Sequence, residues 1–478
     1  MNYKTILYTL GMALYVEGVS LLLPLICALC YNEGEWKYFL ICSLICLSIG
    51  FLLTFKKPER KNIYAKEGFV IVSFTWIIMS IIGCLPFIMS GVIKDFVPAL
   101  FEMVSGFTTT GASVLETLEG VPKSILFWRS FSHWIGGMGV LVLLVSLISL
   151  SGGSNLYLLK AESTGPSVSK LVPKVKSSTT ILYGIYITLT VAEIILLLIC
   201  GLDLFESLTL TFGTAGTGGF GIVDTSIGGY IPAVQWIIGI FMMLFGIDFT
   251  VYYLILIGKI KLAFKSEEFR AYLGIILAAV VIITINCLSC FSGIYEAIRH
   301  SFFQVSSIIT TTGYGTHDFE TWPLLSQMVL LALMFVGACA GSTGGSVKVS
   351  RVLILIKTVL KEIKVSAHPK STHKTMMNGR TVEHETVRAI NVFMVSYLAI
   401  MILSLLLVSF DNQDFTTTFT SVLTTLNNIG PGLGRVGPTD NFSCFSNGAL
   451  LVFIFDMLAG RLEIFPLLIL FSKHTWKK

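Results

Sequence analysis

Residues 309–315 read ITTTGYG, and three other stretches carry a comparable turn of small residues: FTTTGAS at 107–113, GTAGTGGFG at 213–221 and NNIGPGLG at 427–434. Each turn follows an apolar segment too short to cross a membrane, at 96–110, 203–216, 297–311 and 414–428. Aligning one glycine from each turn gives separations of 107, 95 and 117 residues for Gly111, Gly218, Gly313 and Gly430. Repetition at this spacing predicts one structural unit used four times.

The rest of the chain is rich in apolar residues. Of its 478 residues, 54% are hydrophobic and only 13% are charged, against about 25% charged in a soluble protein. A membrane span needs about 20 apolar residues, and such runs recur along the whole length. We expect ten spans, near 5–30, 38–55, 68–91, 127–150, 180–200, 232–258, 271–291, 324–347, 387–409 and 447–472. The predicted fold class is an all-α polytopic membrane protein.

Two features of the chain have alternative explanations that we consider weaker. The first apolar run contains Glu17 and Pro24 and has no clear cleavage site, so we expect a retained helix and not a signal peptide. The cysteine pairs Cys27/Cys30 and Cys287/Cys290 have the spacing of metal ligands, but neither has a second pair or a histidine at comparable depth. We therefore expect buried, reduced cysteines, with neither a metal site nor a disulfide framework.

The distribution of charge predicts the orientation. If both termini are cytoplasmic, the inner segments hold 26 of the 33 Lys and Arg residues, as the positive-inside rule requires. These segments are 1–5, 56–67, 151–178, 259–270, 348–388 and 473–478. The outer segments are richer in acids, which include Glu102, Glu116, Glu119, Asp224 and Asp440. An acidic mouth attracts cations, although such charges can also serve only to keep loops soluble.

The four turns have the composition of an ion-selectivity filter. Non-helical backbone at membrane depth is tolerated where it is buried or lines a water-filled cavity, and glycine allows consecutive carbonyl oxygens to point the same way. Four such strands around an axis make carbonyl rings that replace the hydration shell of K⁺, and TTGYG at 311–315 differs by one residue from the TVGYG filter of K⁺ channels. The alternative is a set of surface turns that cap helices. The candidate filter residues are Thr109, Thr110, Gly111, Thr217, Gly218, Thr311, Thr312, Gly313, Asn428, Ile429 and Gly430.

With these motifs the sequence resembles the TrkH/TrkG/KtrB superfamily of K⁺ transporters, and specifically its TrkH branch. Further motifs carry the resemblance: GGMG at 136–139, GSTGGSVKVSR at 341–351 and AGRLEIF at 459–465. The resemblance implies four helix–pore-helix–helix repeats around one pseudo-fourfold pore, preceded by two N-terminal transmembrane helices. It also implies a homodimer and a cytosolic TrkA-like ring that binds nucleotide. The expected sections are 1–62 for the N-terminal pair and 63–160, 161–262, 263–380 and 381–478 for the repeats.

Two intramembrane features are candidates for a gate. The segment GACAGSTGGSVK at 337–348 interrupts the second helix of the third repeat, and a flexible linker or a small-residue helix contact would be the ordinary explanation. Arg461 lies within the last span, where a lone arginine costs at least ~2.5–3.5 kcal/mol and needs a cavity or a partner such as Asp248. The resemblance instead implies a pore-plugging loop and a pore arginine. The gating candidates are Gly341, Ser342, Thr343, Gly344, Gly345, Lys348 and Arg461, and Ser346 stands where relatives often have glycine.

The sequence therefore predicts K⁺ uptake across the bacterial cytoplasmic (inner) membrane, with K⁺ as the transported ion and no organic cofactor or nucleic-acid partner. A symporter that couples K⁺ to H⁺ or Na⁺ would share this architecture and remains an alternative. A membrane-embedded enzyme is a remote one, because HExxH, GxSxG and paired metal motifs are absent from the sequence. Among other polar residues in the spans, Glu193 and His133 stand out, and we expect His133 to be a hydrogen-bonded helix residue and not a proton relay.

Overall fold

A computed structural model describes residues 2–58, 64–137, 139, 175–369 and 373–476. This part of the chain is almost entirely helical, and its one small sheet pairs strand β1 (Met376–Met377) with β2 (Arg380–Thr381). Six of the described helices are long and apolar enough to cross a membrane, and the number rises to seven if two helices bent by 90° at Pro232–Phe245 and Phe249–Leu256 are counted as one span. The predicted all-α class is confirmed.

The N-terminal pair consists of α1 (Tyr3–Ser20), continued by α2 (Leu22–Cys30), and α3 (Trp36–Thr54). The two helices approach closely because glycines face each other at the crossing. A Cβ on Gly50 would lie 3.0 Å from the carbonyl oxygen of Gly11. Ser43 adds a hydrogen bond of 2.7 Å from its hydroxyl to the Gly18 carbonyl. Small residues and short interhelical hydrogen bonds are the usual means of association in a bilayer.

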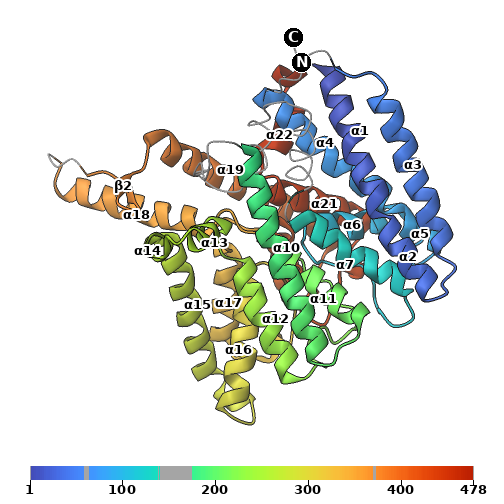
Figure 1. The fold of residues 1–478 in the computed structure, drawn as a ribbon. Coiled ribbons are helices and arrows are strands. Elements are labelled where there is room, and N and C mark those ends of the chain that lie inside the picture. Colours follow the sequence, from blue (N-terminus) through green and yellow to red (C-terminus); the bar gives the residue numbers. More distant parts are fainter. Residues whose placement is uncertain (1, 59–63, 138, 140–174, 370–372, 477–478) are drawn as a thin grey trace.

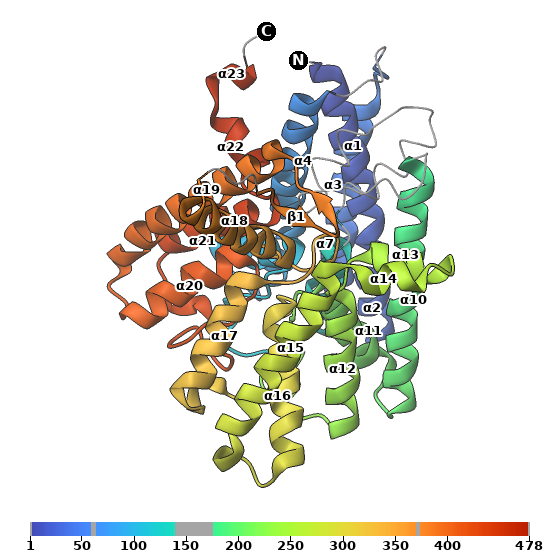
Figure 2. The ribbon, with the colours of Figure 1, turned by 90° about the vertical axis from the view of Figure 1, so that its left-hand side faces the viewer.

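Four helical units follow, and each has a long first helix, a shorter helix that leads into one of the four turns, and one or more helices after the turn (Figures 1 and 2). The first unit contains α4 (Ala65–Gly83), α5 (Leu85–Ser90), α6 (Phe96–Phe107) and α7 (Lys123–Gly137). The second unit contains α10 (Val175–Ile199), α11 (Leu204–Gly216), α12 (Pro232–Phe245), α13 (Phe249–Leu256) and α14 (Ile260–Lys265). The third unit has α15 (Glu267–Asn286), α16 (Ile294–Ile309), α17 (Leu324–Val336) and α18 (Val349–Ala367), and the fourth has α19 (His384–Val408), α20 (Phe415–Asn427), α21 (Asn447–Arg461), α22 (Phe465–Phe471) and α23 (Lys473–Trp476). Single 3-10 turns occur at Leu288–Cys290, Phe319–Thr321, Ser409–Asp411 and Phe442–Cys444.

The predicted second spans of three units are interrupted. This corrects the treatment of 232–258 and 447–472 as single helices, whereas the break in the third repeat agrees with the predicted interruption at 337–348. The span predicted at 232–258 breaks at residues 246–248 with its 90° bend, and the one at 324–347 ends as a helix at Val336. The one at 447–472 breaks at residues 462–464, where Glu463 and Ile464 both have positive φ. The span at 127–150 is helical to Gly137, and its remainder lies outside the described residues apart from residue 139.

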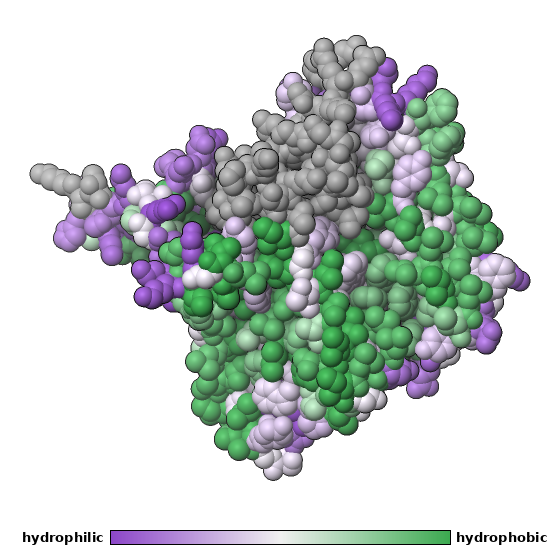
Figure 3. Space-filling view, in the orientation of Figure 1, coloured by the Kyte–Doolittle hydropathy of each residue, from purple (hydrophilic) through white to green (hydrophobic). Residues whose placement is uncertain are grey.

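The surface of the helical bundle is apolar. Large side chains point outward along the long helices, with Ile199 74%, Leu277 67% and Val395 69% exposed. Figure 3 shows this apolar face over α10, α12 and α15, with polar side chains gathered on α18 and the β1–β2 hairpin. Such an exterior is stable in lipid and not in water. The protein is a multi-pass membrane protein, and α23 lies on the side of the bundle where α1 begins (Figure 2).

The cysteines depart from the prediction in one respect. All ten are free thiols, but Cys30 and Cys290 are exposed on the outside of the bundle and not buried. The described residues hold no cluster of three or more His, Cys, Asp and Glu side chains that could bind a metal ion.

Candidate ion-conduction site

The four turns share one backbone conformation, although their sequences differ. In each turn a residue one or two positions after the short helix is left-handed, with φ of 55° at Thr109, 55° at Thr217, 61° at Thr311 and 55° at Asn428. Two residues later each turn has a glycine with φ between 76° and 90°. Left-handed Thr is uncommon and costs free energy that the surrounding structure must offset. Four repetitions of it indicate one shared structural purpose.

The second turn has a different register from the one that the sequence alignment used. Its left-handed glycine is Gly219, equivalent to Gly111, Gly313 and Gly430, and Gly218 instead matches Thr312. The hydrogen bonds agree, because the Gly218 N–H donates to Gly213 five residues back, as Thr312 donates to Ser307. Aligning GFG at 219–221 with GYG at 313–315 would have given this register from the sequence.

The left-handed glycines close a ring of four turns. A Cβ on Gly111 would overlap the carbonyl oxygen of Gly218, one on Gly219 that of Thr312, and one on Gly313 that of Ile429. The fourth turn contacts the first and so closes the ring, since a Cβ on Gly430 would lie 2.8 Å from the Thr110 carbonyl oxygen. Each repeat thus presents a bare glycine to a carbonyl of the next. A side chain at any of these positions would displace that carbonyl.

Hydrogen bonds between buried hydroxyl and amide side chains stabilise the turns. The hydroxyls of Thr108 and Thr110 lie 2.8 Å apart, as do those of Thr310 and Thr312 in the third repeat. The Asn428 amide donates to the Thr110 hydroxyl at 3.0 Å, which ties the fourth turn to the first. These side chains are fully buried. The candidate filter residues therefore lie together, in four turns that hydrogen bonds link and fix in place.

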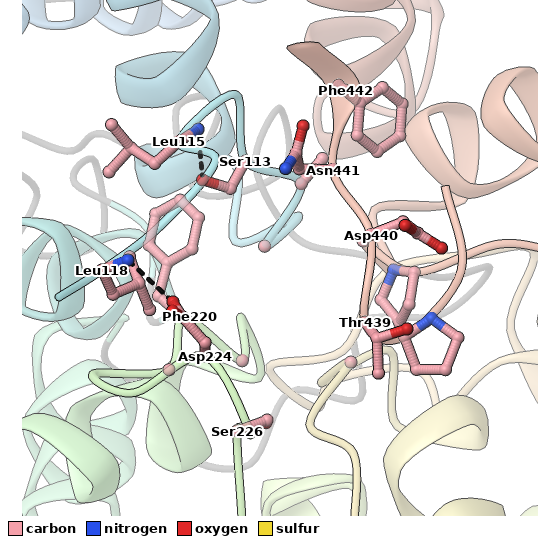
Figure 4. A pocket seen from close by; sticks show the side chains of 18 of the residues that line it. Ser113, Leu115, Leu118, Phe220, Asp224, Ser226, Thr439, Asp440, Asn441 and Phe442 are labelled. Atoms are coloured by element: carbon pink, nitrogen blue, oxygen red, sulfur yellow. Dashed lines mark hydrogen bonds between the residues drawn. The ribbon is translucent and has the colours of Figure 1, made fainter. Parts of the chain in front are cut away.

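A pocket of about 130 Å³ opens on the outer side of the ring. The glycines of the four turns contribute to its lining, together with the acidic residue Glu116. Asp224 and Asp440 line it as well (Figure 4). Asp224 also orders the neighbouring loop, because its carboxylate accepts hydrogen bonds from the Thr117 hydroxyl at 2.8 Å and the Leu118 N–H at 2.7 Å. The acids at this entrance favour cations over anions.

One acid predicted for the outer surface is buried instead. Glu102 is fully buried on α6, and its carboxylate lies 2.7 Å from the guanidinium of Arg129 on α7. The same carboxylate accepts the Val114 N–H at 2.9 Å, while Arg129 donates to the Ser113 hydroxyl at 3.1 Å. Arg129 also lies 4.0 Å from the ring centre of Phe220. This ion pair links the first two turns, and its partners are too far apart in sequence to be matched by spacing.

On the inner side of the ring lies the tip of the loop at 337–348. The Gly345 N–H donates to the Thr311 hydroxyl at 2.7 Å, and a Cβ on Gly345 would lie 2.6 Å from the Asn427 carbonyl oxygen. Thr343, Gly344 and Gly345 are buried there, whereas Gly341 is exposed and Ser342 is half-buried. The loop therefore packs directly against the third and fourth turns. Lys348 is buried at its end and donates to the Gly344 carbonyl.

Ser346 has φ of 65°, in the region that favours glycine. Its hydroxyl compensates by donating to the carbonyl oxygens of Met334 at 2.8 Å and Phe335 at 3.1 Å. These bonds satisfy carbonyls left free where α17 ends. The serine therefore holds one end of the loop against its helix.

Arg461 bridges the loop to the first repeat. Its guanidinium donates to the Thr343 carbonyl at 2.9 Å and to the Gly137 carbonyl at 3.0 Å, and also reaches the Gly136 carbonyl. Asp248, the acid considered as an alternative partner, instead caps α13 by accepting the Thr250 N–H at 2.8 Å. A positive charge thus lies beneath the ring, in contact with the loop.

The remaining intramembrane polar residues lie around the ring or apart from it. His133 packs its ring against Gly218 and stacks on Phe220 with centres 4.2 Å apart. Glu193 is buried on α10, and Glu17 is buried in the N-terminal pair near Gly83.

Comparisons with known proteins identify the family of the chain. The family model described as TrkH, cation transport protein, matches residues 36–478. The chain belongs to the TrkH family. It is 35% identical to the Trk system potassium uptake protein TrkH of Escherichia coli strain K12 and 32% identical to the Trk system potassium uptake protein TrkG of the same strain. The first comparison covers all of both chains, and the second covers all of this chain and 99% of TrkG.

The crystal structure of the potassium transporter TrkH from Vibrio parahaemolyticus has the same fold. It superposes with a TM-score of 0.90 at 31% sequence identity, and the match covers all of both chains. TrkH family members are transport proteins, so the comparisons do not support the enzyme alternative.

Proposed function

We propose that this protein mediates K⁺ uptake across the cytoplasmic membrane of a bacterium, through a selectivity filter formed by the four turns. The observation that supports it most strongly is the closed ring in which each left-handed glycine faces a carbonyl of the next repeat. Rings of backbone carbonyls replace the hydration shell of K⁺. The relatives named potassium uptake proteins match over the whole chain, which supports K⁺ as the ion.

The gate of this pore, we propose, is the tip of the loop at 337–348 together with Arg461. The loop lies against the inner side of the third and fourth turns, where an ion leaving the ring would have to pass. Arg461 adds a positive charge at the same level and donates hydrogen bonds to the loop. A loop with several glycines can adopt a second arrangement at small cost.

The orientation, assembly and regulation belong to the same proposal. Both termini face the cytoplasm, which agrees with the placement of Lys and Arg. The protein forms a homodimer of five-section chains with the boundaries predicted above, and a TrkA-like nucleotide-binding ring docks on its cytoplasmic side. The basic segment 348–388, which includes the projecting α18, offers surface for that ring (Figure 1).

Purified protein in vesicles tests the proposal. We expect K⁺ flux to exceed Na⁺ flux, and we expect deletion of residues 341–345 to raise flux while K⁺ preference is retained. Equal permeation of both ions would refute the filter assignment, and an unchanged flux on deletion would refute the gate. Reversal potentials measured across a pH or Na⁺ gradient identify coupling, since a shift with either gradient would mean symport.

A further inference from the structure

The intramembrane loop has a closed neck, at which its two ends are held together. The Val349 N–H, at the start of α18, donates to the Ala338 carbonyl oxygen at 3.0 Å. Before the buried tip, the Gly341 carbonyl accepts the Phe249 N–H at 3.1 Å, and the Cys339 N–H donates to the Gly246 carbonyl at 3.1 Å. One side of the loop is therefore fixed to the break between α12 and α13.

Glu268, in the first turn of α15, bridges the two ends of the loop. One oxygen of its carboxylate, Oε1, accepts the Ala340 N–H at 2.7 Å and the Ser350 N–H at 3.1 Å. Ala340 belongs to the loop, and Ser350 belongs to the first turn of α18. The N-terminal residue of α18 provides no side-chain cap of its own, so Glu268 caps this helix from another element.

The conformation of the neck is strained on the α18 side. Lys348, immediately before the helix, has φ of 82°, and Ser346 is also left-handed. Left-handed residues other than glycine persist only where contacts hold them. Release of α18 from Glu268 would remove such a contact and allow residues 346–348 to relax, and the loop tip is continuous with them.

From these contacts we propose that Glu268 is a positioning residue of the gate, coupling the start of α18 to the intramembrane loop. A displacement of α18 is transmitted through the Glu268 carboxylate to Ala340, and so to the tip beneath the filter. α18 projects from the bundle, where a cytosolic partner could reach it (Figures 1 and 2). The inference rests on the proposed function, because it requires that the loop obstructs the pore.

The test is vesicle flux per folded protein for Glu268→Ala, which removes both hydrogen bonds. A hydrogen bond to a charged group contributes enough that its loss should raise basal K⁺ flux on the order of tenfold. Glu268→Gln retains an acceptor oxygen at the same place and should restore most of the closure. Glu267→Ala is the matched control, since the Glu267 carboxylate pairs with Lys357 of α18 and, within the described residues, makes no hydrogen bond to the loop. We expect it to leave basal flux within about twofold of wild type.

A purely structural role is distinguished by combining Glu268→Ala with deletion of 341–345. If Glu268 acts through the loop, the substitution should have no further effect on flux once the loop tip is gone. An equal increase in both backgrounds, or unchanged flux for Glu268→Ala with the loop intact, would overturn the inference. Failure of the deletion itself to raise flux would instead refute the proposed gate.

Should Glu268→Ala not yield monodisperse protein, Ser350→Pro attacks the same contact from the other partner. Proline lacks the N–H that Glu268 accepts, and it is tolerated in the first turn of a helix. The coupling predicts raised basal flux for this variant too, abolished by deletion of 341–345. Wild-type flux in Ser350→Pro would contradict it.

Discussion

Gly313→Ser should weaken the discrimination between K⁺ and Na⁺. Gly313 has φ of 88°, and a residue with a Cβ pays about 1–2 kcal/mol in the left-handed region. The new Cβ would also overlap the Ile429 carbonyl oxygen and lie 2.9 Å from Pro431 Cδ. Serine at this position therefore forces the Ile429 carbonyl out of the ring.

We expect the loss of K⁺ over Na⁺ preference to be at least as large, in free energy, as the cost of the left-handed backbone at residue 313. A difference of 1–2 kcal/mol corresponds to a factor of about 5–30 in an equilibrium, so we expect the K⁺ over Na⁺ preference to fall about tenfold or more. Competitive flux in vesicles measures it directly. A host that lacks other K⁺ uptake systems should fail to grow at limiting K⁺ when it depends on this variant.

Gly315→Ser is the matched control, because it makes the same change two residues farther along. Gly315 does not have a left-handed φ, and its nearest neighbour to an added Cβ is Pro438 Cβ at 3.7 Å. Gly430→Ser should fall between the two, since its Cβ would lie 2.8 Å from the Thr110 carbonyl oxygen. Unchanged selectivity for Gly313→Ser, or an equal loss for Gly315→Ser, would refute the steric reasoning.

Three further substitutions test other parts of the site. Arg461→Ala should give folded protein with increased cation leak and retained K⁺ preference in vesicle flux, because the filter carbonyls are untouched; loss of folded protein without a rise in flux would make Arg461 structural. Glu102→Gln should lower the melting temperature, since breaking a buried ion pair costs about 3–5 kcal/mol, and an unchanged melting temperature would contradict this. Asp414→Ala removes the cap of α20 and should cost about 0.5–2 kcal/mol at neutral pH. Hydrogen bonds from Thr417 lower the pKa of Asp414, so the contribution of Asp414 to stability is present above its unfolded pKa and is lost as the pH falls through its folded pKa. The melting temperatures of the variant and the wild type should therefore converge in acid. A difference that stays constant with pH would contradict the capping role.

The short helices before the turns could be predicted well from the sequence. The segments expected at 96–110 and 203–216 correspond to helices at Phe96–Phe107 and Leu204–Gly216. Each begins after a polar residue and ends at small residues that adopt left-handed conformations, so composition marks both ends. The filter turns follow directly, which is why the candidate residues of all four repeats lie together.

The helix breaks on the inner side could not be predicted from hydropathy. Residues 246–248 and 462–464 lie within runs that are apolar on both sides, and hydropathy reports the surroundings of a segment and not the direction of its backbone. Local signals were nevertheless present. Asp248 is an N-cap and Pro466 is in the first turn of α22, and both are typical of a helix start.

The two sides of the ring differ in symmetry, as the proposed division between a filter and a gate requires. On the filter level four turns with unlike sequences adopt one conformation, as a carbonyl cage with equivalent sides requires. Beneath the ring, the second helices of repeats two, three and four break in three different ways. These breaks contact one another. Residues 246–249 form hydrogen bonds with the loop, and Arg351, in α18 directly after the loop, pairs with Glu463. Under the proposed gate, a conformational change confined to one repeat opens or closes the passage without deforming the ring, because the loop has its own anchors at Glu268, the α12–α13 break and Arg461. Substitutions should then alter selectivity and gating separately. Gly313→Ser is expected to reduce the K⁺ over Na⁺ preference, whereas Arg461→Ala is expected to raise the cation leak and retain that preference.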